Sequence, residues 1–395
     1  MLQSCRGVTM KRLLMILLCS LMLVGCVPKD LPEQTSVPTV PETTVEETTV
    51  PEPTLPPETL PPDPVEEILQ SMPLEDWVGQ LFLVGADPNL AEMHIREYNL
   101  GGFLLFSGDF KNETPGDSAA KKIARYQDSA SIPLLIAVDE EGGIVTRISC
   151  YSYYRSSRFS SPRELFAQGG MDAVLAQEEE KCELLRSLGV NVNLGPVCDI
   201  TTDPDAFMYP RSFGQEAPAT ADFVSKMVEL KHRYQIGSAL KHFPGYGNNT
   251  DTHTGIAVDR RTLEELESSD LLPFQAGIDA GSGAVMVSHT IVEALDADLP
   301  ASLSPAVHRY LRSDMGFDGV IITDDLTMQA ITEQYGAGEA AVMAVLAGND
   351  LLCSSSFIEQ YEAVLAAVLD GRIDFDTLKN AVRNVLEWKL ELGLL

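Results

Sequence analysis

The chain has 395 residues, 45% of them hydrophobic and 22% charged, so it holds enough apolar side chains to bury a large core and is not disordered throughout. Its 58 acidic residues outnumber 28 basic ones and give a net charge of -30. A surface this acidic repels phosphate groups, which argues against a nucleic-acid partner. The longest apolar run, residues 13–24, is shorter than the roughly 20 residues that a membrane-spanning helix needs.

That apolar run has the layout of an export signal. It follows the basic stretch M-K-R at residues 10–12 and ends in L-V-G-C at 23–26. The L-x-G-C ending resembles the lipobox of bacterial lipoproteins, which implies cleavage before Cys26 and a lipid on that cysteine. We therefore expect residues 1–25 to be a lipoprotein signal peptide, and the mature protein to be extracytoplasmic and lipid-anchored to the bacterial cell membrane. An ordinary secretory peptide with an incidental Cys26 is the alternative.

The segment after Cys26 has a composition of its own. Residues 27–64 contain 11 prolines, 8 threonines, 8 acidic residues and a single lysine. Such a segment cannot build a core, and proline and like charges both extend it. We expect residues 26–64 to be a lipidated cysteine followed by a linker, and residues 65–395 to be one catalytic domain.

Eight short apolar runs alternate with longer amphipathic segments in that domain. The runs are residues 81–84, 102–106, 134–138, 190–197, 236–243, 284–287, 320–323 and 350–353. Strands separated by helix-length segments pair in parallel, and eight such strands close a barrel. The pattern predicts an α/β fold, specifically a (β/α)8 TIM-like barrel. An open doubly wound sheet is the alternative, although the glycine-rich turn that often accompanies it is missing.

Polar residues cluster at the ends of five of these runs. In chain order they are Asp139, Asp199, Lys241, His242, His289, Asp324 and Asp325. In a (β/α)8 barrel the active site forms where strands end and the following loops begin, so these side chains are expected to converge on one mouth. A single aspartate after a strand often only caps the next helix, but five strand ends together indicate a site.

A second polar motif follows the fifth run. K-H-F-P-G-Y-G at residues 241–247 precedes D-T-H at 251–253. Proline and two glycines turn the chain sharply away from the strand. Asp251 lies two residues from His253 and can orient its imidazole and stabilise the protonated form, as a general acid or base requires. Taken alone, D-x-H is also common in solvated loops.

Together these motifs resemble the signature of glycoside hydrolase family 3, in its β-N-acetylhexosaminidase branch of bacterial muropeptide hexosaminidases. The most specific match is K-H-F-P-G-x-G followed by D-[ST]-H. The others occur in the order of the family, as V-D-E-E-G-G-I-V-T-R at 138–147, N-L-G-P-V-C-D-I at 193–200, R-S-F-G at 211–214 and G-F-D-G-V-I-I-T-D-D-L-T-M at 316–328. The resemblance covers residues 68–395.

The chain departs from the family pattern at three positions. Glu140 replaces a glutamine, Ile144 replaces the first arginine of the glycine motif, and Tyr246 replaces the second histidine of K-H-F-P-G-H-G. The loop before the D-T-H motif is also short. We expect these changes to remove a polar contact around the aglycone and so to alter which muropeptides bind, rather than to remove activity.

The resemblance implies a role for each matched residue. Asp324 is the expected nucleophile, His253 the general acid and base, and Asp251 its orienting partner. The terminal sugar is expected to contact five residues, since aspartate accepts from hydroxyls while arginine and lysine donate: Asp139, Arg147, Arg211, Lys241 and His242. Adjacent strand residues point to opposite faces, so Asp325 is expected to cap the next helix instead.

The expected reaction is retaining exo-hydrolysis of terminal β-linked N-acetylglucosamine, with no metal or other cofactor and with peptidoglycan fragments as the carbohydrate partner. Three alternatives stay open: a family 3 enzyme for another β-sugar, a non-catalytic sugar-binding lipoprotein, and metal-dependent hydrolysis, for which H-x-H and H-E-x-x-H spacings are lacking. The wide spacing of the cysteines within the folded region predicts neither a zinc site nor a disulfide: Cys150, Cys182, Cys198 and Cys353.

Overall fold

The computed structural model describes residues 63–111, 118–201, 203–249 and 255–395. The expected signal peptide, Cys26 and most of the linker lie outside these residues, as do Asp251 and His253. The boundaries at residues 25 and 64 therefore stay predictions.

The core of the described chain is a barrel of eight parallel strands. They are β1 (Phe82–Gly85), β2 (Gly102–Leu105), β3 (Leu135–Val138), β4 (Val192–Asn193), β5 (Gly237–Phe243), β7 (Ala284–Val287), β9 (Val320–Thr323) and β10 (Leu352–Ser354). Their order is β10-β1-β2-β3-β4-β5-β7-β9, and a parallel bridge from Ile322 to Leu351 joins the two ends. The predicted TIM-like barrel is confirmed, and each predicted apolar run overlaps its strand, with β1 and β10 each ending one residue past the run.

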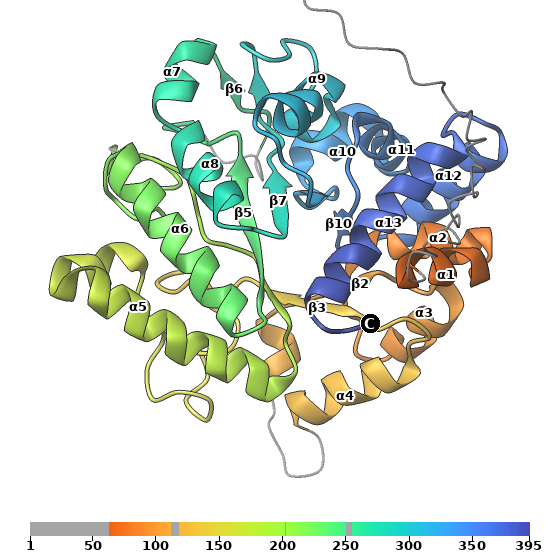
Figure 1. The fold of residues 1–395 in the computed structure, drawn as a ribbon, viewed down its shortest axis with the longest axis horizontal. Coiled ribbons are helices and arrows are strands. Elements are labelled where there is room, and N and C mark those ends of the chain that lie inside the picture. Colours follow the sequence, from red (N-terminus) through yellow and green to blue (C-terminus); the bar gives the residue numbers. More distant parts are fainter. Residues whose placement is uncertain (1–62, 112–117, 202, 250–254) are drawn as a thin grey trace, which may run out of the picture. The chain divides into compact units, whose positions relative to one another are not determined.

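Helices connect and surround the strands (Figure 1). They are α1 (Pro64–Ser71), α2 (Leu74–Gln80), α3 (Ala91–Tyr98), α4 (Ala119–Ser129), α5 (Pro162–Leu188), α6 (Ala217–Arg233), α7 (Leu263–Ser268), α8 (Leu271–Asp279), α9 (Pro305–Arg309), α10 (Gln329–Tyr335), α11 (Ala337–Ala347), α12 (Ile358–Leu369) and α13 (Phe375–Glu391). Two short strands, β6 (Val258–Asp259) and β8 (Ile291–Val292), form a separate two-stranded parallel sheet. Ser161 and Glu164 form a capping box that begins α5.

Alternate residues of each strand point to opposite faces, which divides the apolar side chains into two layers. One set fills the barrel and includes Leu83, Leu104 and Ile322, while the other packs under the helices. The buried Trp388 of α13 joins the inner set at the amino-terminal ends of the strands. Gly237 and Gly283 lie against its ring, and a Cβ at either position would come within 2.8 Å of it. Helix α13 therefore closes this end of the barrel, and the other end is left for the site.

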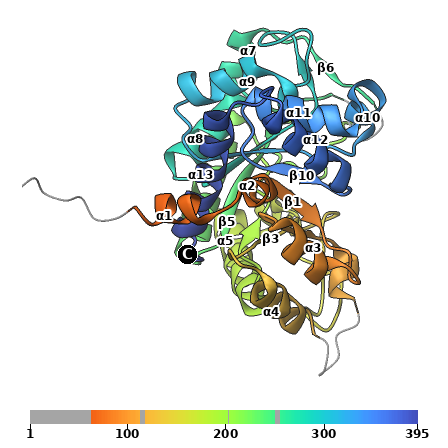
Figure 2. The same ribbon diagram turned by 90° about the vertical axis from the view of Figure 1, so that its right-hand side faces the viewer.

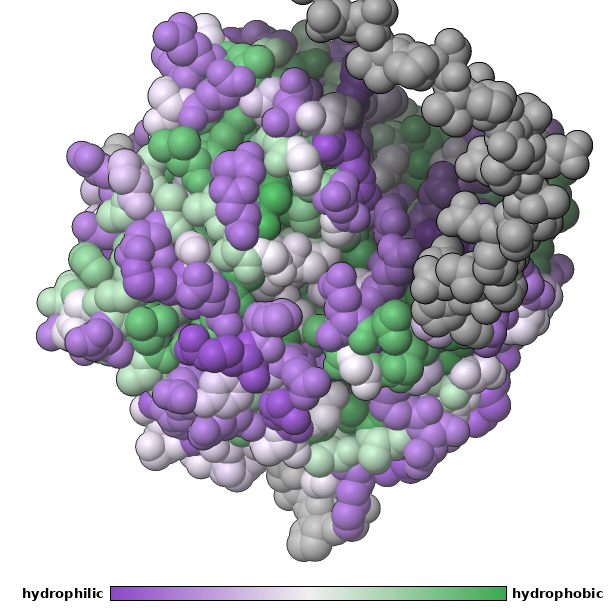
Figure 3. Space-filling view, viewed as in Figure 1, coloured by the Kyte–Doolittle hydropathy of each residue, from purple (hydrophilic) through white to green (hydrophobic). Residues whose placement is uncertain are grey.

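The first and last described helices lie side by side, as Figure 2 shows. Arg383 of α13 pairs with Asp63 at 2.8 Å and also with Glu66 of α1, and Lys379 pairs with Glu66 at 3.0 Å. Asp63 in addition caps α1 through the backbone of Val65. The face of the molecule in Figure 3 carries hydrophilic residues between small hydrophobic patches. Among the described residues, no helix is long and apolar enough to span a bilayer.

Candidate active site

A cavity of about 170 Å³ opens at the carboxyl-terminal ends of the strands. All six predicted site residues that the structure describes line it: Asp139, Arg147, Arg211, Lys241, His242 and Asp324. The remaining walls are Leu104, Phe106, Val145, Leu194, Met286, Asp325 and Cys353. Residues from the ends of β2, β3, β5, β7, β9 and β10 thus meet at one place, as the barrel predicts.

A network of buried ion pairs forms one wall of the cavity. The Lys241 ammonium lies 2.6 Å from Asp139 Oδ1 and 2.7 Å from Glu141 Oε1. Glu141 also accepts two hydrogen bonds from Arg211, at 2.7 and 3.0 Å. The Lys241 side chain is 2% exposed and that of Glu141 5%, so solvent screens these pairs only weakly.

This network shifts the pKa values of Glu141 and Lys241 in favour of their charged forms. Burial raises the pKa of Glu141, but Arg211 and Lys241 lower it more, and the pKa lies well below its usual range. Burial likewise lowers the pKa of Lys241, but Asp139 and Glu141 raise it more, so the net pKa of this ammonium lies above its ordinary value. The cations are therefore fixed donors at neutral pH, suited to bind hydroxyl or carbonyl oxygens.

The Asp199 carboxylate orients His242 and holds the loop that follows it. Asp199 is 1% exposed and accepts from His242 Nδ1 at 2.8 Å, from the His242 backbone at 3.1 Å and from the Tyr246 backbone at 2.8 Å. Arg211, which can only donate, lies 3.2 Å from His242 Nε2. The proton therefore resides on Nδ1, and Nε2 accepts from Arg211. Asp199, whose role the sequence left open, is a positioning residue.

Glu140 organises the loop that carries Arg147. It is fully buried, and its carboxylate accepts from the backbones of Arg147 and Ile148, both at 2.7 Å, and from the Ser149 backbone and hydroxyl at 3.3 and 2.5 Å. Four donors on two oxygens suit a carboxylate better than an amide, which has one oxygen. This accounts for glutamate where the family pattern has glutamine.

Arg147 keeps an unused donor beside the cavity. Its guanidinium lies 3.5 Å from Asp139 Oδ2 and 5.7 Å from the centre of the Phe106 ring. Its Nε is buried and has no hydrogen-bond partner among the residues that the structure describes. A buried donor without a partner costs free energy, which the rest of the fold must offset.

Asp324 and Asp325 follow β9 and differ in what they contact. Asp324 lines the cavity, and its backbone N–H donates to Val287 at the end of β7. Asp325 accepts from the Thr327 backbone and hydroxyl, at 2.9 and 2.8 Å, and from the Ser355 backbone at 3.2 Å. Helix α10 begins only at Gln329, after Met328. The expectation that Asp325 caps this helix is therefore wrong: it ties the loop after β9 to the loop after β10.

His289 supports the same loop from the end of β7. It is fully buried, with Nδ1 2.7 Å from the Ser302 hydroxyl and Nε2 3.0 Å from the Asp325 carbonyl oxygen. Because a carbonyl can only accept, Nε2 carries the proton. His289 thus holds the backbone next to Asp324 in place.

Tyr246 and Ile144, two of the departures from the family pattern, lie in different surroundings. Tyr246 is 1% exposed, packs with Phe207 and Met208, and meets the His242 ring edge-on at 5.3 Å. The expected change of a polar contact at the aglycone therefore does not fit Tyr246, which is buried behind His242. Ile144 is 64% exposed on the turn next to Val145, which lines the cavity.

Arg261 holds the described residues on both sides of segment 250–254. It contacts both oxygens of Asp259, at 3.0 and 2.6 Å, and Asp270 at 2.6 Å, and its guanidinium lies 3.4 Å from the Gly245 carbonyl. Gly245 and Asp259 flank the D-T-H motif in sequence. One side chain thus links Gly245, which precedes this segment, to Asp259, which follows it.

Glu141 and Asn193 are the main site-forming residues that sequence reasoning did not select. Asn193 accepts from the Glu140 backbone at 3.0 Å and donates to the Glu140 carbonyl at 3.2 Å, which clips β4 to the loop after β3. The E-E-G-G run did contain Glu141, but its partners are far away in the sequence. The four cysteines of the described segments are free thiols, and these segments hold no group of three or more His, Cys, Asp or Glu able to bind a metal ion.

Replacing Glu141 with glutamine is expected to destabilise the fold by about 3 kcal/mol at pH 7, because two buried cations lose their shared carboxylate. The depressed pKa of Glu141 means that its contribution exists above the unfolded pKa near 4.3 and is lost as pH falls below it. The difference in unfolding free energy between wild type and Glu141→Gln should therefore become smaller as the pH is lowered from about 6 to about 3.

Denaturant unfolding across this pH range measures the gap. Glu339→Gln is the matched control, because Glu339 also takes two bonds from one arginine, Arg372, but about half of each side chain is exposed. It should change stability little at any pH. A gap for Glu141→Gln that does not depend on pH would contradict the electrostatic assignment.

Comparison with known proteins identifies the family. The family model described as "Glycosyl hydrolase family 3 N terminal domain" matches residues 73–388. The chain is 32% identical over 285 residues to beta-hexosaminidase LpqI of Mycobacterium tuberculosis, covering 70% of this chain and 71% of that protein. It is 32% identical over 278 residues to a beta-hexosaminidase of Xanthomonas campestris pv. campestris, covering 69% of this chain and 82% of that protein.

Solved structures agree with this result. A family 3 beta-N-acetylglucosaminidase from Paenibacillus sp. str. FPU-7 superposes with a TM-score of 0.75 at 32% identity, over 82% of this chain, which spans only 63% of that longer protein. The structure of M. tuberculosis LpqI superposes with a TM-score of 0.74 at 28% identity, over 82% of this chain and 96% of that one. The predicted glycoside hydrolase is thus confirmed, and the chain belongs to glycoside hydrolase family 3.

Proposed function

We propose that this protein is a retaining exo-β-N-acetylglucosaminidase that removes terminal β-linked N-acetylglucosamine. The observation that carries the proposal is the single cavity in which Asp139, Lys241, Arg211, Arg147 and Asp324 converge. Its fixed cations suit the hydroxyls of one sugar ring. The relatives named beta-hexosaminidase and beta-N-acetylglucosaminidase support this choice of sugar.

In the proposed mechanism, the Asp324 carboxylate attacks the anomeric carbon while the glycosidic C–O bond breaks. His253, kept protonated by Asp251, gives its proton to the departing oxygen. The neutral imidazole then takes a proton from water, and that water displaces Asp324 from the sugar. Two displacements at one carbon return the original configuration. This scheme replaces the usual acid carboxylate of glycosidases with an imidazole.

We propose that peptidoglycan fragments are the substrate and that the protein acts on them outside the cytoplasmic membrane. The proposal rests on the export signal at residues 10–26 and the extended segment 27–64 in the sequence. A hydrolase anchored there by Cys26 would meet the cell wall as its nearby source of β-linked N-acetylglucosamine.

The substrate assignment is tested with a set of nitrophenyl glycosides. The protein should cleave the β-N-acetylglucosaminide and leave the β-glucoside and β-xyloside nearly untouched. Adding phosphate distinguishes water from phosphate as the acceptor, since a phosphorylase would release the sugar 1-phosphate. N-acetylglucosaminyl muropeptides, with and without their peptide, then test the aglycone. Preferential cleavage of the β-glucoside would favour the alternative family 3 β-glycosidase.

Cys26→Ser is expected to move the full-length protein from the membrane fraction to the soluble fraction of a bacterial host, because stable anchoring needs the lipid. The nitrophenyl turnover number should not change. A shortened chain that begins at Pro62 serves as the control, since it keeps Asp63, the cap of α1 and partner of Arg383. Membrane association that persists in Cys26→Ser would reveal another anchor.

A further inference from the structure

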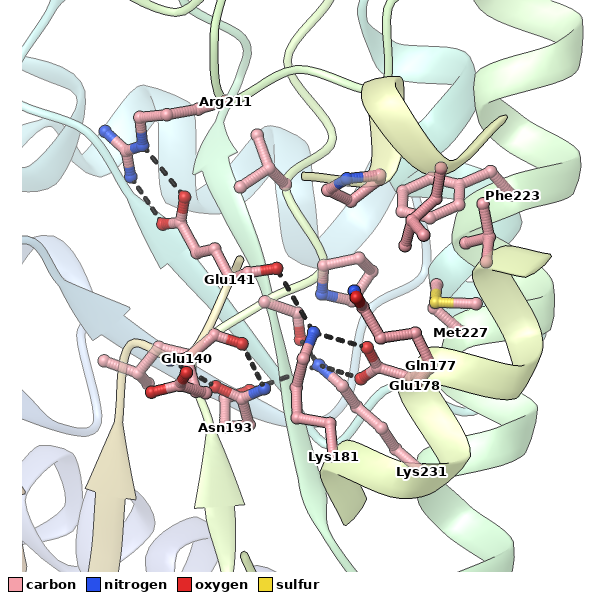
Figure 4. Close-up of a pocket in the computed structure, with 17 residues that line it drawn as sticks. Glu140, Glu141, Gln177, Glu178, Lys181, Asn193, Arg211, Phe223, Met227 and Lys231 are labelled. Atoms are coloured by element: carbon pink, nitrogen blue, oxygen red, sulfur yellow. Dashed lines mark hydrogen bonds and ion pairs between the residues drawn. The ribbon is translucent and has the colours of Figure 1, made fainter. Parts of the chain in front are cut away.

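Directly behind the cavity lies a second buried group of charges, drawn in Figure 4. It consists of Glu178 and Lys181 on α5 and Lys231 on α6, which pack side by side outside the barrel. Their side chains are 7%, 4% and 2% exposed. Two lysines with one glutamate leave a buried excess of positive charge, which costs free energy unless backbone oxygens satisfy the ammonium groups.

Lys231 supports the end of β4. Its ammonium donates to the Gly195 carbonyl at 2.7 Å and lies 3.4 Å from the Asn193 carbonyl. Asn193 in turn holds both backbone groups of Glu140. The Glu140 carboxylate then fixes the backbone of Arg147. A path of direct hydrogen bonds therefore leads from Lys231 to a cation of the sugar cavity.

Lys181 supports the neighbouring loop after β3. Its ammonium lies 3.2 Å from the Glu141 carbonyl and 2.7 Å from Glu178. Figure 4 shows the Glu141 carboxylate on the far side of the same residue, paired with Arg211. Glu141 is thus held by its backbone from behind and by Lys241 and Arg211 from the cavity side.

Glu178 and Lys231 keep their charges in spite of burial. Burial raises the pKa of Glu178, but Lys181 and Lys231 lower it more, and the net pKa is below its ordinary value. Burial lowers the pKa of Lys231 to about 8, so this ammonium is still largely protonated at neutral pH. Burying the Lys231 ammonium costs desolvation free energy that an apolar side chain of equal size would avoid. Its presence therefore indicates that its N–H donors are needed at this place.

We propose that Lys181 and Lys231, paired with Glu178, are positioning residues that fix Glu141 and Arg147 for binding of the terminal sugar. They act through backbone carbonyls and do not touch the substrate. The proposal rests on the proposed glycosidase function. Since Arg147 lines the sugar cavity and Glu141 pairs with the lining residues Lys241 and Arg211, losing either cluster lysine should weaken binding of the sugar and leave protonation of the leaving group untouched.

The test compares Lys181→Met and Lys231→Met with Lys389→Met. Lys389 is the matched control: it is fully buried and contacts Gln80 at 2.7 Å, just before β1, at the opposite end of the barrel. Three quantities are measured for each folded variant: the melting temperature, the inhibition constant of free N-acetylglucosamine, and kcat/KM on a nitrophenyl glycoside and on a natural disaccharide.

Both cluster variants should raise the inhibition constant and lower kcat/KM about tenfold or more, by the same factor on both substrates, as expected for a displaced binding group. Lys389→Met should lower the melting temperature but leave the inhibition constant within about twofold of wild type, too small a change for a displaced group. Should the methionine variants not fold, Glu178→Gln, which keeps the volume but removes the shared counter-charge, should also raise the inhibition constant.

Inhibition constants that equal the wild-type value in Lys231→Met, Lys181→Met and Glu178→Gln would overturn the positioning role. The same conclusion follows if Lys389→Met matches the cluster variants in every quantity. Failure of the proposed function looks different, because wild type itself would then neither cleave the glycosides nor bind N-acetylglucosamine.

Discussion

Replacing Asp324 with alanine is expected to reduce turnover by about 10⁴-fold or more, because the covalent route loses its nucleophile. Asp324 lines the cavity at the end of β9; its backbone N–H donates to the Val287 carbonyl, and its carboxylate accepts from the Asp325 backbone N–H at 2.8 Å. The loss should appear in kcat on both activated and natural substrates, since both need the same attack at the anomeric carbon. Melting temperature should change little.

Asp325→Ala provides the contrast at the adjacent position. Asp325 binds Thr327 and Ser355, so its removal should cost about 1–3 kcal/mol of stability and leave measurable activity. A mechanism-based fluoro-sugar should label the peptide that contains Asp324. Labelling of Asp139 or Asp199 would refute the assignment, although the Asp199 carboxylate is already engaged by three donors.

The barrel could be predicted because its strands carry their own signal. Runs such as 134–138 and 320–323 are buried on both faces and are therefore apolar except for Thr323, and the polar residues Asp139 and Asp324 follow them. The rule that strand ends converge then placed Asp139, Lys241 and Asp324 at one mouth, and the family resemblance added Arg147 and Arg211; the structure has all five there.

The supporting residues could not be predicted because their partners are distant in the sequence. Glu141 contacts Arg211, 70 positions away, and Lys231 reaches Gly195, 36 positions away, from the last turn of α6. A lysine in an amphipathic helix is normally expected on the solvent-exposed face, so nothing in the sequence near Lys181 or Lys231 indicates that they are buried. Asp325 was misjudged for a related reason: the partner that competes for its carboxylate, Ser355, follows a different strand.

His253→Ala is expected to lower the rate on a natural disaccharide by about 10²- to 10⁴-fold, the usual contribution of general acid–base catalysis. The loss should be much smaller for the first step on a nitrophenyl glycoside, because that leaving group departs with little protonation. The glycosyl-enzyme on Asp324 should then accumulate, since no base activates the water that hydrolyses it. Pre-steady-state release of nitrophenol should show this as a burst.

Asp251→Asn separates the two members of the motif. Without its carboxylate partner the imidazolium is less favoured, so the pKa of His253 should fall and the alkaline limb of the pH profile should move to lower pH. The rate at the optimum should fall less than in His253→Ala, because the acid itself is still present. Unlike a variant of Lys231, neither change should raise the inhibition constant of N-acetylglucosamine, since neither residue is assigned to the sugar.

The leaving-group dependence is the decisive feature of the His253 experiment. A residue that only binds substrate or supports the fold would lower kcat/KM on the disaccharide and on the nitrophenyl glycoside by one common factor, with no burst. An acid must instead lower the rate more as the leaving group becomes a stronger base, and a base must slow the second step on every substrate. Equal losses without a burst would therefore remove His253 from the mechanism, and Asp324 would need a different proton donor.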